Sequence, residues 1–234
     1  MTITASTATA DRSTADPTRN NARAGGILYL LTFAASLPAL FLLSPVLNNP
    51  DYIVSAGQDT RVLWGCFLDF VNALAAVGTA VAVFPVIKRV NESLSLGFVM
   101  SRMFEAAVIM IGVVSILAVV TLRQDQAGDV ATGQALVAVR DWTFLLGPGM
   151  AAFNAILFGT VLYRSRLVPR LIPAIGLIGA PLLLTANLLT FFGHNAQTSA
   201  WSLLATLPIA AWELSVGFYL TFKGFRRTAL TFQP

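Results

Sequence analysis

Residues 95–122 read SLGFVMSRMFEAAVIMIGVVSILAVVTL and indicate the class of fold most directly. About 20 consecutive apolar residues are enough for an α-helix to cross the hydrocarbon core of a bilayer. This stretch is longer than that, its only charged residues are Arg102 and Glu105, and it does not alternate polar and apolar positions as a barrel strand does. It therefore predicts a transmembrane helix that carries two ionisable side chains inside it.

Five further stretches of the chain have the same character. They are Gly25–Leu47, Val62–Ile87, Trp142–Tyr163, Val168–Phe192 and Trp201–Thr221. Of the 234 residues, 56% are apolar and 11% are charged, whereas soluble domains carry about 25% charged residues. A water-soluble globule is therefore excluded, and we predict an all-α bundle of six transmembrane helices that forms one domain over residues 25–227.

The charged residues outside the spans predict an orientation. Residues 1–24 are rich in Thr, Ala, Ser and Asp, so we expect a disordered cytoplasmic tail there and a short second tail over residues 228–234. These tails and the loops on their side hold eleven Lys and Arg residues, whereas the other side holds only Arg61, Arg123 and Arg140. The positive-inside rule then places both termini in the cytoplasm. Because Arg greatly outnumbers Lys, as in GC-rich bacteria, we expect a multi-pass protein of a bacterial plasma membrane.

Four ionisable side chains lie within the predicted spans, namely Asp69, Arg102, Glu105 and Glu213. Each costs about 2.5–3.5 kcal/mol at the centre of a bilayer on insertion scales, so the four must face one another or a wet cavity. Arg102 and Glu105 are three residues apart, which puts them on one face of a helix within reach of an ion pair. By residue count, Glu105 and Glu213 lie near mid-depth, whereas Asp69 lies in the outer half.

Two asparagines complete the predicted intramembrane polar site. Asn72 follows Asp69 by three residues, and Asn154 lies near mid-depth in the fourth span. One guanidinium cannot neutralise three carboxylates, so the fully ionised set would carry a net charge of −2 in a poor dielectric. We therefore expect at least one of the three carboxyl groups to be protonated at neutral pH.

Other features of the chain argue against several common chemistries. Cys66 is the only cysteine, so no internal disulfide is possible. His194 stands alone, and no zinc spacing, phosphate-binding loop or nucleophile elbow appears, so we predict no metal and no cofactor. The basic residues form no stripe on a folded domain, which argues against nucleic acid as a partner. Gly147–Gly149 predicts a kink in the fourth span, and Val130–Val139 a short helix at the membrane interface.

Several blocks of the sequence, in this order and spacing, resemble a bacterial six-span family known only as a domain of unknown function. The resemblance covers about residues 22 to 227 and implies the six-span fold, but it implies no activity. It includes Arg102, Glu105 and Glu213, the residues that the charge argument selects. The blocks are ARAGGILYL at 22–30, FPVIKR at 84–89, RMFEA at 102–106, YRSRLVPR at 163–170, WEL at 212–214 and KGF at 223–225.

Three classes of function fit these observations. The first, which we prefer, is a membrane protein that binds or moves a proton-coupled or amphipathic small molecule through the polar site. The second is an intramembrane enzyme that acts on a lipid or isoprenoid, for example by acid-initiated cyclisation in an aromatic-lined cavity. The third is a non-catalytic accessory protein in which Arg102, Glu105 and Glu213 form a clamp that fixes the register of the helices. Membrane lipids are partners in all three.

Overall fold

The computed structural model describes residues 17–226, and within them the chain forms helices and no strand. Six segments are long and apolar enough to cross a membrane. The prediction of an all-α bundle of six transmembrane helices is thereby confirmed. In chain order, the elements are α1 (Pro17–Leu47), the 3-10 helix η1 (Tyr52–Val54), α2 (Asp59–Ile87), α3 (Glu92–Gln124), α4 (Val130–Gly149), α5 (Ala151–Ser165), α6 (Leu171–Phe191) and α7 (Ala200–Phe222).

Two helices, α1 and α4, begin eight residues or more before the predicted start of their spans. α1 starts at Pro17, so residues 17–24, which we expect in the disordered tail, form its first turns instead. The rest of the two predicted tails, residues 1–16 and 227–234, lies outside the described residues. α4 starts at Val130, where the carboxylate of Asp129 accepts a hydrogen bond from the N–H of Thr132 at 2.8 Å and caps the helix. The prediction of a short interface helix over Val130–Val139 is therefore wrong, because these residues begin a long helix.

The contacts between the helices arrange the six spans in a closed ring. α1 packs between α2 and α7, and from α7 the ring continues through α6, α5 and α3 back to α2. Two adjacent glycines allow α1 this position. A Cβ atom on Gly25 would lie 2.5 Å from Val83 of α2, and one on Gly26 would lie 2.7 Å from the carbonyl oxygen of Gly217 in α7. The missing side chains let helices approach closely, so the first and last spans meet.

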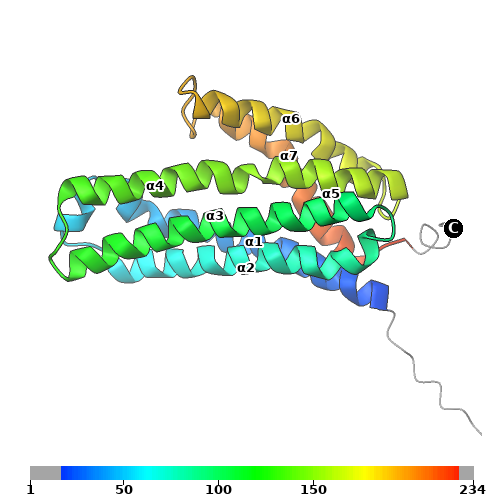
Figure 1. The fold of residues 1–234 in the computed structure, drawn as a ribbon, viewed down its shortest axis with the longest axis horizontal. Coiled ribbons are helices and arrows are strands. Elements are labelled where there is room, and N and C mark those ends of the chain that lie inside the picture. Colours follow the sequence, from blue (N-terminus) through cyan, green and yellow to red (C-terminus); the bar gives the residue numbers. More distant parts are fainter. Residues whose placement is uncertain (1–16, 227–234) are drawn as a thin grey trace, which may run out of the picture.

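The two ends of the bundle differ (Figure 1). The start of α1, the α2–α3 turn, the α5–α6 turn and the end of α7 lie at one end, the terminal end, whereas η1 and the α3–α4 turn lie at the other, the η1 end. α3 has 33 residues, which gives about 50 Å of helix against a hydrocarbon core of about 30 Å. α6 has only 21 residues, and the α6–α7 loop stops short of the η1 end. The long helices therefore extend beyond the α6–α7 hairpin at the η1 end.

The fourth span is interrupted where the sequence predicts a kink. Pro148 has no N–H, so the carbonyl of Phe144 loses its usual partner, and α4 ends at Gly149. Met150 keeps a right-handed helical conformation, with φ −63° and ψ −15°, and its N–H donates to the carbonyl of Gly147 at 2.9 Å. The chain then resumes as α5. The interruption keeps the chain on a helical path and leads it into α5, where Asn154 is fully buried.

Candidate functional site: a polar centre within the membrane

The interior of the bundle holds a buried guanidinium between two carboxylates. Arg102 of α3 is 2% exposed, and its Nη1 donates to Oε2 of Glu105 on the same helix at 3.0 Å. Its Nη2 lies 3.5 Å from Oε1 of Glu213 in α7. Asn154 of α5 donates through Nδ2 to the same oxygen of Glu105 at 2.7 Å. These four residues, which we call the polar centre, join three helices through charge-assisted hydrogen bonds.

The two glutamates of the polar centre differ in the number and length of the hydrogen bonds that they accept. From the described residues, Glu105 receives two hydrogen bonds no longer than 3.0 Å, one from Arg102 and one from Asn154. Glu213 receives one, which is 3.5 Å long, and its side chain is 13% exposed. A buried carboxylate is stabilised by the donors around it. Glu213 is therefore the less stabilised of the two anions.

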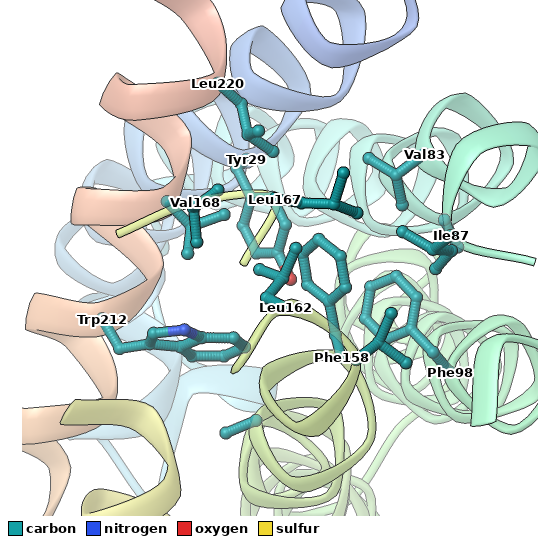
Figure 2. Close-up of a cluster of buried hydrophobic side chains, with 14 of the residues drawn as sticks. Tyr29, Val83, Ile87, Phe98, Phe158, Leu162, Leu167, Val168, Trp212 and Leu220 are labelled. Atoms are coloured by element: carbon teal, nitrogen blue, oxygen red, sulfur yellow. The ribbon is translucent and has the colours of Figure 1, made fainter. Parts of the chain in front are cut away.

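Aromatic rings lie close to the guanidinium of Arg102, and Figure 2 shows four rings in this part of the bundle. Cζ of Arg102 lies 4.7 Å from the ring centroid of Tyr29 and 5.9 Å from that of Phe98, within the range of cation–π attraction. Phe158 stacks on Phe98 at 4.7 Å, and Trp212 meets Phe158 edge-on at 6.5 Å. The four rings converge from α1, α3, α5 and α7. They exclude water from one side of the ion pairs, and the low local dielectric strengthens the charge interactions.

Several buried polar atoms around the polar centre have no hydrogen-bond partner in the described part of the chain. They are Oη of Tyr29, Oγ of Ser101, Nε of Arg102, Oδ1 of Asn154 and Nε1 of Trp212. Buried polar groups are normally satisfied by protein or ordered water, and an unsatisfied one costs about 1–3 kcal/mol. Donors and an acceptor from four helices are therefore free to bind a polar ligand or water molecules.

Asp69 lies apart from the polar centre and has its own arginine. Arg140 of α4 donates through Nη2 to Oδ2 of Asp69 in α2 at 2.8 Å, and both side chains are 8% exposed. Gly112 of α3 makes the space for this contact, since a Cβ atom there would lie 2.9 Å from Cδ of Arg140. The prediction that Arg140 belongs to an outer loop is wrong. α4 starts at Val130 and carries Arg140 into the interior, whereas the predicted span begins at Trp142.

The second guanidinium changes the charge of the interior. With Arg140 included, the polar centre and the Asp69–Arg140 pair together hold three carboxylates and two guanidiniums, a net charge of −1 rather than the predicted −2. Asp69 and Arg140 neutralise each other. The whole excess of negative charge therefore lies at the polar centre, where one arginine serves two glutamates.

The predicted site residues thus fall into two groups. Four of the six form the polar centre, whereas Asp69 and Asn72 line a separate cavity of about 40 Å³ together with Arg140. We call this space the Asp69 cavity. Its other walls include Ser36 of α1, Ile109 of α3 and Pro148 of α4. The structure does not join the two groups into one site, because α2 is absent from the contacts of the polar centre.

Two further residues of these sites were not predicted from the sequence. Tyr29 lies in the middle of a span, whereas tyrosines in membrane proteins usually lie at the interfaces, and this departure could have singled it out. Arg140 lies on the same helical face as Gly133 and Gly147, which are buried at intervals of seven residues. Extending that periodicity back from the predicted fourth span would have placed Arg140 inside the bundle.

Comparison with known proteins identifies one matching family. A family model described as a domain of unknown function (DUF4386) matches residues 24–224, which include the polar centre and the Asp69 cavity. No curated protein and no solved structure matches the chain. The resemblance that the sequence blocks indicate is therefore confirmed.

Proposed function

The chain belongs to the DUF4386 family, whose description names no activity, and we propose a function from the geometry of the polar centre. In this proposal the protein binds a small amphipathic molecule within the membrane and couples this binding to a proton carried by Glu213. The proton-coupled function that the sequence favours would thus depend on the carboxyl group of Glu213.

The observation that carries the proposal is the excess charge of the polar centre and its uneven distribution. Two carboxylates and one guanidinium become neutral when they gain one positive charge. A proton on Glu213 supplies this charge at low cost, because that carboxylate has a single contact of 3.5 Å. A proton on Glu105 would weaken two shorter bonds, from Arg102 and Asn154. A ligand that brings a positive charge can take the place of the proton.

Arg102 provides the coupling between the proton and the structure. One of its terminal nitrogens holds Glu105 in its own helix, and the other reaches Glu213 in α7. When Glu213 becomes neutral, the attraction between α3 and α7 weakens, and the shared guanidinium is left to Glu105. Two states of the α3–α7 contact thus have different affinities for the proton, which is the requirement for coupling it to a second ligand. The unpartnered Oδ1 of Asn154 and Nε1 of Trp212 supply an acceptor and a donor for that ligand.

Infrared spectroscopy of the protein in lipid tests the assignment of the proton. We expect a protonated-carboxyl band at neutral pH that is lost in Glu213→Gln. Asp69→Asn is the matched control, because it removes a buried carboxyl group that already has its own arginine, and it should leave the band in place. A wild-type spectrum without the band, or a band lost in Asp69→Asn instead, would show that Glu213 does not carry the proton.

The two alternative functions make different demands on the same residues. An enzyme that cyclises a prenyl chain needs aromatic rings around an open cavity, but Phe98 and Phe158 stack on each other at 4.7 Å, as packed core residues do. We therefore do not prefer this alternative. An accessory protein needs the polar centre only as a clamp between α3 and α7. In that case, Glu213→Gln should weaken the fold, and the infrared band should be absent.

We also propose that both termini face the cytoplasm and that the membrane is a bacterial plasma membrane. Within residues 17–226, nine Lys and Arg residues lie at the terminal end, whereas the η1 end carries only Arg61 and Arg123 because Arg140 is inside the bundle. This asymmetry supports the proposed orientation. A C-terminal fusion should therefore fluoresce with green fluorescent protein and be inactive with alkaline phosphatase. The opposite pair of results would reverse the orientation.

A further inference from the structure

We infer that a pocket at the η1 end is the access site for the ligand, and that the ligand is a small organic cation with an apolar body. This inference rests on the proposed function and adds to it the route and the charge of the ligand. The pocket, which we call the loop pocket, has a volume of about 230 Å³ and lies between α1, η1, α3 and α4. That size suits a molecule with one aromatic ring or a short branched chain.

The loop pocket has apolar walls and one acidic side chain. Val46 of α1, Ile53 of η1, Val119 of α3 and Val137 of α4 all line it. Asp141 of α4 lines it as well, is exposed, and forms no ion pair with any of residues 17–226. Apolar walls with a few polar groups that orient the ligand are typical of small-molecule sites. An unpaired carboxylate beside such walls favours a ligand with a single positive charge.

The η1 wall of the loop pocket is held in place by its own network. The hydroxyl of Tyr52 donates to Asp59 at 2.8 Å, and Arg123 pairs with the same carboxylate and donates through Nε to the carbonyl of Ser55 at 2.8 Å. Burial and the bond to Asp59 raise the pKa of Tyr52, so the hydroxyl remains a donor at all ordinary pH values. Ile53 packs directly on the backbone of Gly133. The pocket is therefore preformed.

The loop pocket, the Asp69 cavity and the polar centre follow one another along the same helices. The loop pocket and the Asp69 cavity are adjacent on α4, since Asp141 lines the first and Arg140 lines the second. The Asp69 cavity and the polar centre are one turn apart on α3. Ile109 of the Asp69 cavity is four residues from Glu105 of the polar centre, or about 6 Å along the helix. Along α1, Val46 lines the loop pocket, Ser36 lines the Asp69 cavity and Tyr29 contacts Arg102 of the polar centre. A row of sites thus leads from the η1 end to Glu213.

The charges along this row favour a cation. The row holds four carboxylates and two guanidiniums, so it carries a net charge of −2 when all these groups are ionised. The carboxylates are those of Asp141, Asp69, Glu105 and Glu213, and the guanidiniums those of Arg140 and Arg102. The Asp69 cavity, at about 40 Å³, exceeds the roughly 10–15 Å³ that one water molecule needs. It can therefore hydrate a charged group on its way inward. An anion would be repelled at both ends of the row, and a neutral molecule could not replace the proton on Glu213.

Binding of benzyltrimethylammonium to the full chain in lipid nanodiscs tests this inference. Its uncharged isostere neopentylbenzene has the same shape, and benzenesulfonate has the opposite charge. We expect only the cation to bind, and Asp141→Asn to weaken its binding by about tenfold. Asp129→Asn is the matched control, because it removes a charge from the same end while Asn still caps α4, and it should leave the affinity unchanged.

A second variant tests the pocket itself. Ala138 lines the loop pocket and is exposed, so Ala138→Trp should fill the pocket and abolish binding without lowering the thermal stability. Equal binding of neopentylbenzene, or full affinity in Asp141→Asn, would overturn the choice of a cation. Full affinity in Ala138→Trp would overturn the site. The infrared band of Glu213 does not depend on this pocket, so its presence beside either failure would leave the proposed function standing.

Discussion

Two buried ion-paired sites lie in this bundle, and they differ in how well their charges match. Asp69 and Arg140 form a one-to-one pair at 2.8 Å between α2 and α4. At the polar centre, one guanidinium is shared by Glu105 at 3.0 Å and Glu213 at 3.5 Å. A further positive charge would stabilise the neutral Asp69–Arg140 pair little. A proton or a cation would stabilise the polar centre, because it neutralises the excess negative charge there. Both sites are buried, so it is their balance of charge that distinguishes them. The neutral pair is expected to hold helices together, and the negatively charged polar centre to bind a proton or a cation.

The largest expected effect is that of removing Arg102. Arg102→Met keeps most of the side-chain volume but leaves two buried carboxylates without a cation. Because breaking a buried ion pair typically costs about 3–5 kcal/mol, we expect a loss at the upper end of that range. Denaturant unfolding in detergent measures it. Arg140→Met is the matched variant and should cost less, because it leaves one carboxylate beside a polar cavity. Equal losses would contradict the distinction between the two sites.

A double-mutant comparison sharpens the contrast. Asp69→Asn combined with Arg140→Gln removes both charges of the matched pair, so the double variant should be more stable than Arg140→Gln alone by about 1–3 kcal/mol. Glu213→Gln combined with Arg102→Gln should show little such recovery, because Glu105 remains buried without a cation. Unfolding free energies of the six variants and wild type give both coupling energies. Recovery of the same size at both sites would mean that Glu105 does not depend on Arg102.

The two glutamates of the polar centre should also differ from each other. Glu105→Gln weakens two short hydrogen bonds and should cost about 1.5–3 kcal/mol. Glu213→Gln removes the excess charge and one contact of 3.5 Å, so its stability should stay within about 1 kcal/mol of wild type or exceed it. Melting temperatures in detergent compare the two. A larger loss in Glu213→Gln would favour the accessory-protein alternative, in which this residue serves as a clamp.

The last prediction concerns the glycine of α3 that accommodates Arg140. In Gly112→Ala, the new methyl group would lie 2.9 Å from Cδ of Arg140 and still closer to Oγ1 of Thr143, so α3 and α4 must shift, at a cost of about 1–3 kcal/mol. In Gly159→Ala, the nearest side-chain atom, from Leu177, lies at 3.4 Å, so the change should be neutral or stabilising. Thermal unfolding of both variants provides the test. If Gly112→Ala were as stable as wild type, Arg140 would not be confined by α3.

The features that could be predicted from the sequence are those that depend on residues close together in the chain. Length and continuous apolarity belong to neighbouring residues, so the spans can be found without knowing how they pack. Arg102 and Glu105 are three residues apart, and the geometry of one helix brings them together in any fold. The kink at Pro148 follows in the same way from the missing N–H of a single residue. The start of α4 was missed because residues 130–141 are only moderately apolar and are helical through their packing against α3.

The six-span helical bundle and the ionisable groups in its interior are predictable from the amino-acid sequence, because both properties follow from short stretches of chain. The pairing of those groups depends instead on how the helices pack. Arg140 meets Asp69 across 71 residues of chain, and Arg102 meets Glu213 across 111. Such partners are set by which helices become neighbours, here through the close approach of α1 to α7 at Gly26 and of α3 to α4 at Gly112. The charge left over at the polar centre follows from that pairing.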